Sequence, residues 1–507
     1  MSTHQESPNV IILIADCLRQ ASATRRNLPF ITSNSDLQFT RCYSPSTWTL
    51  PSHVSLFTGT TPNHHQVTRR TKYSEQGDTI DPAQVSLPTK AKQNGYTTAL
   101  FSENPHFSRR VGFDQNVDFV DDWINFKRWA SNFSAVNYIS PTSPSLREIP
   151  TVVKKIAGSN RPVTNLGNTV FGAWQYASDS EPKFPHQGMR ILDHLELYVS
   201  STDGPKLVTA NLMDTHNPHY SPPERGVEAL NESFDAEQLE SLVAASDNRF
   251  YMFTEDQRLP TDARDGFSSW EDVFRMRRSV YNTQIRYFDH LVKAWANTVS
   301  NSVLDNSLVI VTGDHGQLFG EEGRAGHHTS LHPHGVNVPL FVSLPARWAS
   351  QKEKVDDVTS WIDLTRTVED VMCGDIASGD EFVKRITENG EAIVTVDGSG
   401  YDLVGLKADD RFETDLVDQI LATRKIGVIR DEHMIVYESK WESTELSKTE
   451  FELSSGQRTI RDISESTPGK EISLSAQNWL TQRKKSKAFQ RQVNGPIAER
   501  LESLGYK

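Results

Sequence analysis

Three aspartates stand just after apolar runs of the chain, and their carboxylates could bind a cation. They are Asp16 after Asn9–Ala15 (NVIILIA), Asp214 after Lys206–Met213 (KLVTANLM), and Asp314 after Ser307–Thr312 (SLVIVT) and one glycine. Apolar, β-branched runs of this length predict strands buried on both faces of a parallel sheet. Because the carboxyl ends of parallel strands meet at one edge of a sheet, the three carboxylates are expected there together.

Three carboxylates at one edge would repel one another unless a cation lay between them, so the pattern predicts a metal site. His315 directly follows Asp314, and His216 lies two residues past Asp214. A donor set of carboxylate and imidazole suits Zn²⁺ or Mn²⁺ better than Ca²⁺, which prefers oxygen ligands. The alternative is that the aspartates only cap the turns that follow. Capping is the better interpretation for Asp16 or Asp214 taken alone, and metal binding is the better one for the Asp-His-Gly motif.

A second candidate element is the segment STWTLPSHVSLFTG at 46–59, which predicts a short helix with a buried face. Thr49 stands before Leu50-Pro51, and proline favours the first turn of a helix. Its hydroxyl therefore lies where free backbone N–H groups and the helix dipole favour an anion. Bound to a metal it could become a nucleophile, with His53 one turn further on to contact a bound oxyanion. On composition alone, a capping threonine and a surface histidine are the favoured alternative.

A third candidate element is the loop GHHTSLHPH at 326–334, which contains four histidines. Such density suggests metal or phosphate contacts, although an exposed histidine-rich loop can also lack any function. We expect one or two of these side chains to reach the site, with His327 first, as a catalytic residue, and His328 as a substrate contact. Together with Asp214 and His216 the loop could form a second metal site, so the sequence leaves the choice between one and two metal ions open.

The elements that must position these residues alternate between buried strands and helices. Apolar residues at helical spacing predict helices at 187–199 and 271–298, and a shorter one ends before Gly95. This alternation predicts an α/β fold with a large, mostly parallel sheet that helices cover on both faces. Residues 121–185 contain clusters of Pro, Ser and Asn, and we interpret them as an irregular insertion at one edge of the sheet.

The pattern of the chain changes after residue 410. Lys425–Glu438 predicts a hairpin that turns at Asp431–Glu432, Glu450–Leu453 continues it, and Ile497–Leu504 predicts a closing amphipathic helix. We therefore expect a catalytic domain over 1–410 and a small α+β C-terminal subdomain over 411–507.

Composition limits the partners and the compartment of the protein. The 507 residues have a formal net charge of −13 and are 36% hydrophobic, which is typical of a soluble globular protein and not of a nucleic-acid binder. The three cysteines, Cys17, Cys42 and Cys373, give no disulfide framework and suit a reducing compartment. The N-terminus shows no signal-peptide pattern and no run is long enough for a membrane helix, so we expect a cytoplasmic protein.

Taken in order, the motifs resemble those of the sulfatase family within the alkaline phosphatase superfamily. They are D-x-x-R at 16–19, T-x-P-S-H-x-S-L-F-T-G at 49–59, N-L-M-D-T-H at 211–216, T-G-D-H-G at 312–316 and V-P-L-F-V at 338–342. The resemblance implies an alkaline phosphatase-like fold over nearly the whole chain. It also implies a divalent metal ion (Mn²⁺, Zn²⁺, Mg²⁺ or Ca²⁺) that is held by Asp16, Thr49, Asp314 and His315.

The resemblance implies further roles around that metal. His216 matches the histidine that contacts the transferred group or assists the leaving oxygen. Asn104, in the segment SENPH, aligns with a substrate-contacting basic pair of relatives, and Asp214 is a further candidate for substrate contact.

The chain departs from true sulfatases at the nucleophile. Sulfatases carry C-x-P-S-R or S-x-P-S-R, whose first residue is oxidised to formylglycine, whereas this chain has Thr49 and His53 at the two ends of that motif. Threonine cannot give the aldehyde hydrate, so no formylglycine is expected. Cys17 replaces the second aspartate of the usual Asp-Asp pair, and His315 replaces the usual asparagine. Threonine with Asp-His resembles instead the phosphodiesterase, lipoteichoic acid synthase and phosphoethanolamine transferase branches.

These inferences predict a metal-dependent hydrolase of phosphoric or sulfuric esters with a covalent Thr49 intermediate. A threonine ester must be cleaved at phosphorus or sulfur, and in-line displacement at phosphorus does this readily, so a phosphoric mono- or diester is favoured. In this hypothesis His53 and His216 hold ester oxygens, and His216 or His327 protonates the leaving group. The substrate would be a small-molecule ester or that of a glycan or lipid head-group. Two alternatives stay open, a transferase that moves a phospho-group to a glycan or lipid head-group and a catalytically silent relative that binds a ligand.

Overall fold

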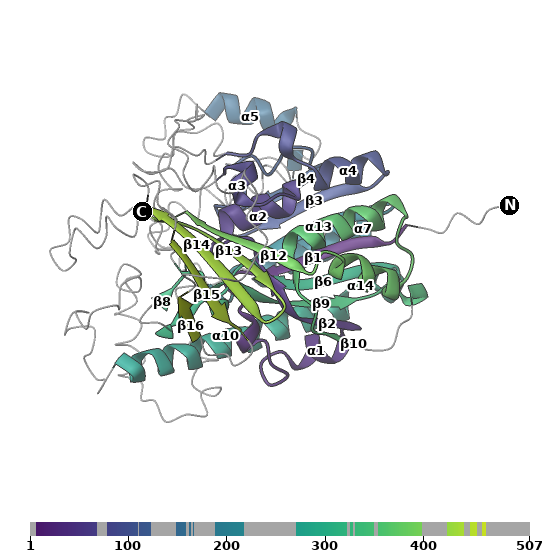
Figure 1. Cartoon of the computed structure of the whole chain (residues 1–507). Coiled ribbons are helices and arrows are strands. Elements are labelled where there is room, and N and C mark those ends of the chain that lie inside the picture. The colour runs from purple at the N-terminus through teal and green to yellow at the C-terminus, as the bar shows by residue number, and fades with distance from the viewer. Residues whose placement is uncertain are drawn as a thin grey trace.

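The computed structural model describes residues 7–67, 79–109, 111–122, 149–158, 162–163, 166, 188–216, 270–321, 325–327, 330–348, 353–397, 423–440, 447–453 and 459–462. These residues form a large mixed sheet with helices on both faces and a second, smaller sheet beside it (Figure 1). The predicted α/β class is therefore confirmed. Among the described residues no helix is both long and apolar enough to cross a membrane.

The large sheet has nine strands in the described part of the chain. Their order is β10 (Glu353–Val355), β2 (Leu37–Tyr43), β9 (Asn337–Ser343), β6 (Ser307–Gly313), β1 (Asn9–Ala15), β5 (Lys206–Leu212), β3 (Thr97–Ser102) and β4 (Phe119–Asp122), and β11 (Thr359–Ser360) also pairs with β2. Strands β6, β1, β5, β3 and β4 are parallel, whereas β9 is antiparallel to both β6 and β2. The three predicted buried runs are β6, β1 and β5, which lie side by side.

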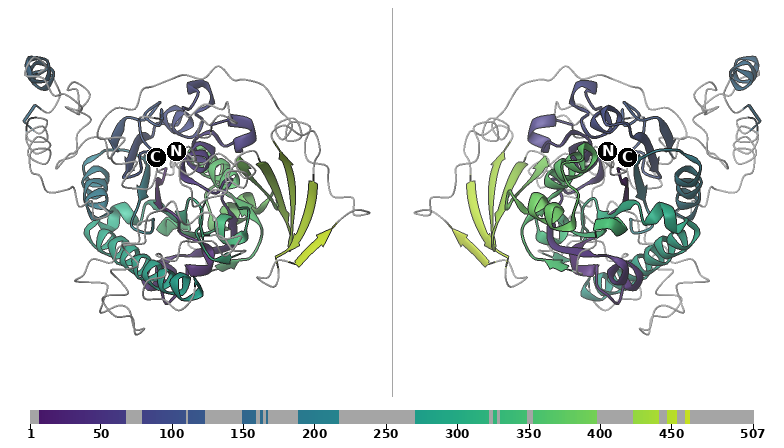
Figure 2. Two further views of the ribbon diagram at one scale, coloured as in Figure 1. Left: turned by 90° about the vertical axis from the view of Figure 1, so that its left-hand side faces the viewer. Right: turned by 90° about the vertical axis from the view of Figure 1, so that its right-hand side faces the viewer.

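Strand β1 shows why the sheet is buried on both faces. Its residues alternate between two apolar cores, with Val10, Ile12 and Ile14 in one and Ile11, Leu13 and Ala15 in the other. The first core includes side chains of α2 (Thr49–Thr58), α4 (Leu87–Gln93), α13 (Trp361–Cys373) and α14 (Gly379–Thr387). The second core includes those of α1 (Pro29–Asn34), α7 (Gly188–Ser201) and α10 (Trp270–Thr298). Figure 2 shows these helices around the sheet from two sides.

Shorter elements connect these layers. They are α3 (Pro62–His65), α5 (Ile149–Ala157), α11 (Asn301–Leu304), α12 (Pro333–Val336) and the ribbon of β7 (Leu318–Phe319) and β8 (Ala325–Gly326). The helices predicted at 187–199, at 271–298 and before Gly95 correspond to α7, α10 and α4. Most of the predicted insertion at 121–185 and the predicted closing helix at 497–504 lie outside the described residues.

The small sheet is antiparallel and lies at the C-terminal end of the described chain. Its strands are β12 (Glu391–Asp397), β13 (Thr423–Arg430), β14 (His433–Lys440), β15 (Ser447–Glu452) and β16 (Thr459–Asp462). The predicted hairpin consists of β13 and β14, and Asp431 in its turn has a φ of 44°, which aspartate tolerates better than most residues. Strand β12 lies before the predicted boundary at residue 410 and pairs with β13, so the sheet draws on both sides of that boundary.

Strand β12 also contacts the segment that leads into α2. The N–H of Thr395 donates to the carbonyl oxygen of Pro45 at 2.9 Å, and the carbonyl oxygen of Thr395 accepts from Oγ of Ser46 at 3.1 Å. The two sheets therefore meet directly before the helix that begins at Thr49.

Candidate active site

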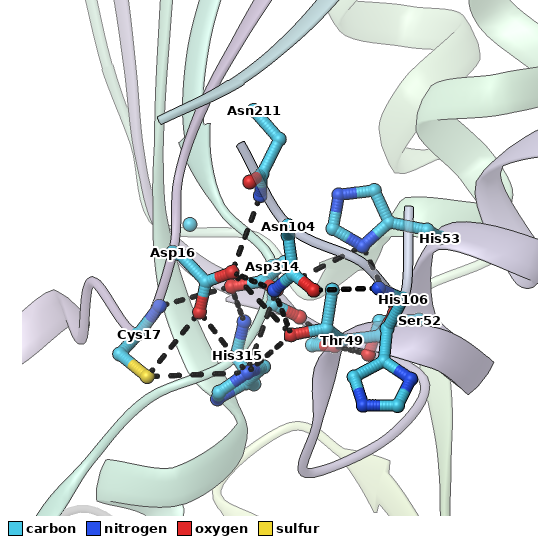
Figure 3. A network of polar contacts seen from close by, with 12 residues as sticks. Asp16, Cys17, Thr49, Ser52, His53, Asn104, His106, Asn211, Asp314 and His315 are labelled. Atoms are coloured by element: carbon cyan, nitrogen blue, oxygen red, sulfur yellow. Dashed lines mark hydrogen bonds and ion pairs between the residues drawn. The ribbon is translucent and has the colours of Figure 1, made fainter. Parts of the chain in front are cut away.

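Polar side chains from five elements meet at the carboxyl edge of the large sheet (Figure 3). Asp16 follows β1, Asp314 and His315 follow β6, Asn211 lies in β5, Asn104 comes two residues after β3, and Thr49 begins α2. All six residues are fully buried. The order of the strands, rather than proximity in the sequence, brings this cluster together.

Thr49 is the first residue of α2, and its hydroxyl points into the cluster. Trp48, in an extended conformation, occupies the capping position, so the alternative of a capping threonine does not hold. Gly59 ends the helix with a φ of 64°, a left-handed conformation that glycine adopts without strain. Oγ1 of Thr49 lies 3.4 Å from Oδ2 of Asp16 and 3.4 Å from Nε2 of His315. The hydroxyl therefore faces two of the predicted metal ligands.

The surroundings of the two aspartates in the cluster shift their pKa values in opposite directions. Burial acts to raise the pKa of Asp16, but the charges of His216 and His315 and a hydrogen bond from Asn104 bring it below its ordinary value. Burial and the negative charge of Asp16 hold the pKa of Asp314 well above its ordinary value. A cation next to Asp314 would favour its ionised form, because it would offset both effects.

The side chain of Asp314 is held by the backbone. Its Oδ1 accepts the backbone N–H of Cys17 at 3.0 Å and that of His315 at 2.9 Å. Its Oδ2 lies 3.4 Å from Nε2 of His315 and 3.8 Å from Nδ1 of His53. One oxygen of this carboxylate thus joins the turns after β1 and β6, and the other is directed into the cluster.

His315 presents a lone pair to the same place. Its Nδ1 donates to the carbonyl oxygen of Gly316 at 3.0 Å, so the neutral ring carries its lone pair on Nε2. Burial lowers the pKa of His315 to about 4, which keeps the ring neutral near pH 7. Its Nε2 lies 3.6 Å from Oδ1 of Asp16. A neutral imidazole between two carboxylates, with its other nitrogen bonded to a backbone carbonyl, is typical of a metal ligand.

The described residues contain three overlapping sets of side chains that could hold a metal ion. They are Asp16, Asp314 and His315; Asp16, Cys17 and His216; and Cys17, His315 and His327. Within each set the ligand atoms lie within 4.8 Å of one another, a separation that ligands around one divalent ion can close. The first set consists of the predicted metal ligands other than Thr49, whose hydroxyl borders it.

His216 and His327 lie together beside Asp16. Nε2 of His216 is 4.0 Å from Oδ1 of Asp16, and the ring centroids of His216 and His327 are 5.3 Å apart. The ring of His327 is also 4.6 Å from that of His315, and its Nδ1 lies 2.8 Å from Oε1 of Gln317. Both histidines that were predicted to assist the leaving group thus reach the cluster.

His53 lies beside the cluster, but its ring faces aromatic side chains. Its Nδ1 donates to the carbonyl oxygen of Thr49 at 2.9 Å. The ring centroid lies 4.1 Å from that of Phe107 and 5.7 Å from that of Trp361, and burial lowers the pKa of His53 to about 4. The contact of His53 with an oxyanion stays a prediction, and these contacts favour a role in holding the first turn of α2.

Of the predicted substrate contacts, Asn104 belongs to the cluster. Its Nδ2 donates to Oδ2 of Asp16 at 2.7 Å and to Oγ1 of Thr49 at 3.2 Å. Asp214 is buried next to Gly188, at the start of α7, and none of the three sets includes it. Burial and the charge of Glu103 raise its pKa well above the ordinary value. His328 lies outside the described residues.

Two members of the cluster were not predicted from the sequence. Nδ2 of Asn211 donates to Oδ2 of Asp16 at 3.3 Å, and Sγ of Cys17 lies 3.4 Å from Oδ1 of Asp16. An asparagine inside a strand that is buried along its whole length is the signal that could have revealed the first, because a buried amide needs a hydrogen-bond partner. For Cys17 the signal is its position, because it stands where relatives carry the second aspartate of the Asp-Asp pair; its residue type gives none, since cysteine is common among buried apolar residues.

Comparisons with known proteins support this fold. The family model described as Sulfatase matches residues 8–374. A phosphonate monoester hydrolase of Agrobacterium radiobacter is similar over 89% of this chain and 90% of its own, with 16% identity and a TM-score of 0.54. A putative sulfatase from Bacteroides thetaiotaomicron is similar over 90% of this chain and 88% of its own, with 14% identity and a TM-score of 0.55. A structure described as a 2-O GAG sulfatase covers 88% of this chain and 85% of its own, with 14% identity and a TM-score of 0.54. The comparison with curated proteins gave no match.

Proposed function

Since this chain belongs to the sulfatase family, whose members are metal-dependent ester hydrolases, we propose that it cleaves phosphoric or sulfuric esters with Thr49 as the nucleophile. The observation that carries this proposal is the position of Oγ1 of Thr49. It lies 3.4 Å from both Asp16 and His315 and accepts a hydrogen bond from Asn104 at 3.2 Å. A hydroxyl in this position at the start of a helix can become an alkoxide next to positive charge.

The residues of the cluster fit a divalent ion. Asp16 and Asp314 are fully buried carboxylates, and burying such charges without compensation is unfavourable. The lone pair on Nε2 of His315 adds a nitrogen donor to their oxygens. When bound there, the ion would supply the Lewis acidity that favours the alkoxide form of Thr49 and withdraws charge from the ester oxygens.

Hydrolysis would then take place as two in-line displacements at phosphorus or sulfur, the first by Thr49 and the second by water. Oγ1 of Thr49, after loss of its proton to solvent, attacks phosphorus or sulfur, and the bond from that atom to the leaving oxygen breaks. His216 or His327, both next to Asp16, gives a proton to the leaving oxygen. A water molecule then gives a proton to the same histidine and attacks phosphorus or sulfur, and the bond from that atom to Oγ1 of Thr49 breaks. The acid group is released, and Oγ1 takes a proton from solvent, which restores the hydroxyl.

We favour phosphoric over sulfuric esters because the nucleophile is a threonine. A formylglycine hydrate can release sulfate by collapsing to its aldehyde, whereas the Thr49 ester has to be cleaved at the central atom. Displacement at phosphorus suits this second step.

The test compares turnover of Thr49→Ala, Thr49→Ser and wild-type protein on an aryl phosphate, an aryl phosphodiester and an aryl sulfate, each with Mn²⁺, Zn²⁺, Mg²⁺ or Ca²⁺. We expect Thr49→Ala to lose at least about a thousandfold in turnover and Thr49→Ser to keep part of it. Thr58→Ala is the matched control, because Thr58 ends the same helix and its hydroxyl contacts only Val54 and Thr60, which lie outside the cluster. Rapid quenching and mass spectrometry should find the ester on the peptide that contains Thr49. Turnover that survives in Thr49→Ala, or an adduct on another residue, would refute the proposed nucleophile.

A further inference from the structure

The carboxylate of Asp16 divides the cluster into two sides of different chemistry. Its Oδ2 faces the hydroxyl of Thr49 at 3.4 Å and the amide of Asn104 at 2.7 Å. Its Oδ1 faces Sγ of Cys17 at 3.4 Å and Nε2 of His216 at 4.0 Å. Figure 3 shows the sulfur of Cys17 and the hydroxyl of Thr49 on opposite sides of the Asp16 carboxylate. The side away from the proposed nucleophile is therefore rich in sulfur and imidazole donors.

The sulfur of Cys17 is close to two further histidines. It lies 3.7 Å from Nδ1 of His327 and 4.0 Å from Nε2 of His315. Both sets of candidate ligands that include His216 or His327 also include Cys17, and every residue in them is buried. Cys17 is thus the donor that these two sets share.

The backbone directs this side chain into the cluster. Cys17 has a φ of 65°, a left-handed conformation that residues other than glycine rarely adopt. Its N–H donates to Oδ1 of Asp314 at 3.0 Å, and its carbonyl oxygen accepts from the hydroxyl of Tyr281 at 2.7 Å. The second buried cysteine, Cys42, belongs instead to the apolar core on one face of the large sheet.

We propose that Cys17 binds the metal of this centre through its sulfur, beside the imidazole nitrogen of His315, so that the centre selects Zn²⁺ or a similar ion over Mg²⁺ and Ca²⁺. This inference rests on the proposed function, because it concerns the metal of the same site. Thiolate and imidazole select zinc-like ions, whereas sets of oxygen donors select Mg²⁺ and Ca²⁺. One metal–sulfur bond forms on binding, and the thiol proton leaves to solvent.

The first experiment follows the metal–sulfur bond directly. The full chain is stripped of metal with a chelator and titrated with Co²⁺, while the near-ultraviolet spectrum is recorded. A thiolate bound to Co²⁺ gives a sulfur-to-metal charge-transfer band there. We expect this band in the wild-type protein and in Cys42→Ser, and its loss in Cys17→Ser, which should still bind Co²⁺ with at least about tenfold lower affinity.

The outcomes separate this inference from the proposed function. Co²⁺ that binds the wild-type protein without a charge-transfer band, or a band that persists in Cys17→Ser, would overturn the role of Cys17 and leave the proposed hydrolase intact. A protein that binds no Co²⁺, Zn²⁺ or Mn²⁺ at all would overturn the proposed metal-dependent function as well.

The second experiment uses Cys17→Asp, which keeps an anionic donor but replaces sulfur with oxygen. Aspartate tolerates the left-handed conformation better than most residues, so this variant guards against a misfolded Cys17→Ser. Competition titrations should show the preference for Zn²⁺ over Mn²⁺ and Mg²⁺ reduced by at least about tenfold. An unchanged preference in a folded Cys17→Asp protein would contradict the inference.

Discussion

The hydroxyl of Tyr281, on α10, donates a hydrogen bond of 2.7 Å to the carbonyl oxygen of Cys17. The same hydroxyl oxygen accepts the N–H of Arg19 at 3.0 Å. One side chain from the helix layer thus satisfies two backbone groups of the turn after β1, which includes the left-handed residue Cys17. The turn that contains Asp16 is therefore fixed by hydrogen bonds to α10, a helix more than two hundred residues away in the chain.

We expect Tyr281→Phe to destabilise this turn, because it leaves a buried carbonyl and a buried N–H without their shared partner. The free energy of unfolding should fall by about 1–3 kcal/mol, as measured by urea unfolding of the metal-free protein. Tyr198→Phe is a suitable control, since Tyr198 is only partly buried, and it should change the value by less than about 0.5 kcal/mol. An equal loss of stability in both variants would contradict the prediction that the hydrogen bond from Tyr281 to Cys17 stabilises the turn.

Asn104 should affect turnover more than binding. Its amide donates to both Asp16 and Thr49, so it fixes the distance between the carboxylate and the proposed nucleophile. We expect Asn104→Ala to lower kcat by about a hundredfold with little change in KM. Asn94→Ala, which removes exposed bonds to the carbonyl oxygen of Lys90 and to the sulfur of Cys373, serves as the control. A rise in KM at constant kcat would show that Asn104 acts in substrate binding instead.

While the metal is absent, the ionised side chain of Asp314 should lower the free energy of unfolding of the protein. Its pKa is held above the ordinary value, so the folded chain resists its ionisation and stability is lost as the pH rises above about 4, the value of the unfolded chain. Asparagine keeps Oδ1, which accepts the N–H groups of Cys17 and His315, and carries no charge. We therefore expect metal-free Asp314→Asn to be more stable than the wild-type protein at pH 7, and the difference to disappear as the pH falls below about 4.

Metal addition should reverse that order. An ion at a hundred times its Kd stabilises the wild-type protein by about 2.7 kcal/mol, and Asp314→Asn should gain much less because a ligand is lost. Urea unfolding with and without Zn²⁺ measures both effects. A metal-free variant less stable than the metal-free wild-type protein would contradict the interpretation of the buried charge.

His65, in α3, gives a pH effect that is separate from the cluster. Its Nδ1 accepts the N–H of Val67 at 3.0 Å and its Nε2 lies 3.0 Å from Oγ of Ser55, so the neutral ring uses both nitrogens. Burial lowers the pKa of His65 to about 3. The unfolded chain therefore takes up a proton near pH 6.5 that the folded chain does not. Stability is complete above that pH and falls as the pH falls towards about 3.

We expect His65→Asn to remove this acid sensitivity, since the oxygen of asparagine can accept the N–H of Val67 without titrating. Between pH 8 and pH 5 the metal-free wild-type protein should lose roughly 2 kcal/mol more than the variant. Urea unfolding at the two pH values measures the difference. Parallel pH profiles for the two proteins would contradict the assignment to His65.

The sequence was sufficient for the centre of the fold and for part of the cluster. Three apolar runs that end in aspartate marked β1, β5 and β6, and the rule that strand ends share an edge placed Asp16 and Asp314 together. The same rule failed to distinguish Asp214, because the strand-end position does not say towards which neighbour a side chain turns. In the structure this carboxylate faces Glu103 and the start of α7.

Other contacts depend on packing that the sequence pattern does not reveal. His53 follows Thr49 by about one helical turn, and its Nδ1 lies 3.8 Å from Oδ2 of Asp314, but its ring also packs against Phe107 and Trp361. Their position comes from other parts of the chain, which no periodicity within α2 encodes. Cys17 shows the same limit, because its left-handed conformation depends on contacts with Asp314 and Tyr281 from distant segments.

The hydrogen bonds between Thr395 and the Pro45–Ser46 pair mean that a shortened chain must include strand β12 to hold these two residues in place. A fragment that stops at residue 374, where the family match ends, would still contain Asp16, Thr49, Asp314 and His315. It would nevertheless lack strand β12 and so release the residues immediately before the nucleophile. A truncation at the family boundary would thus keep every proposed reacting group. It would lose the hydrogen bonds from Thr395 that hold the segment just before Thr49.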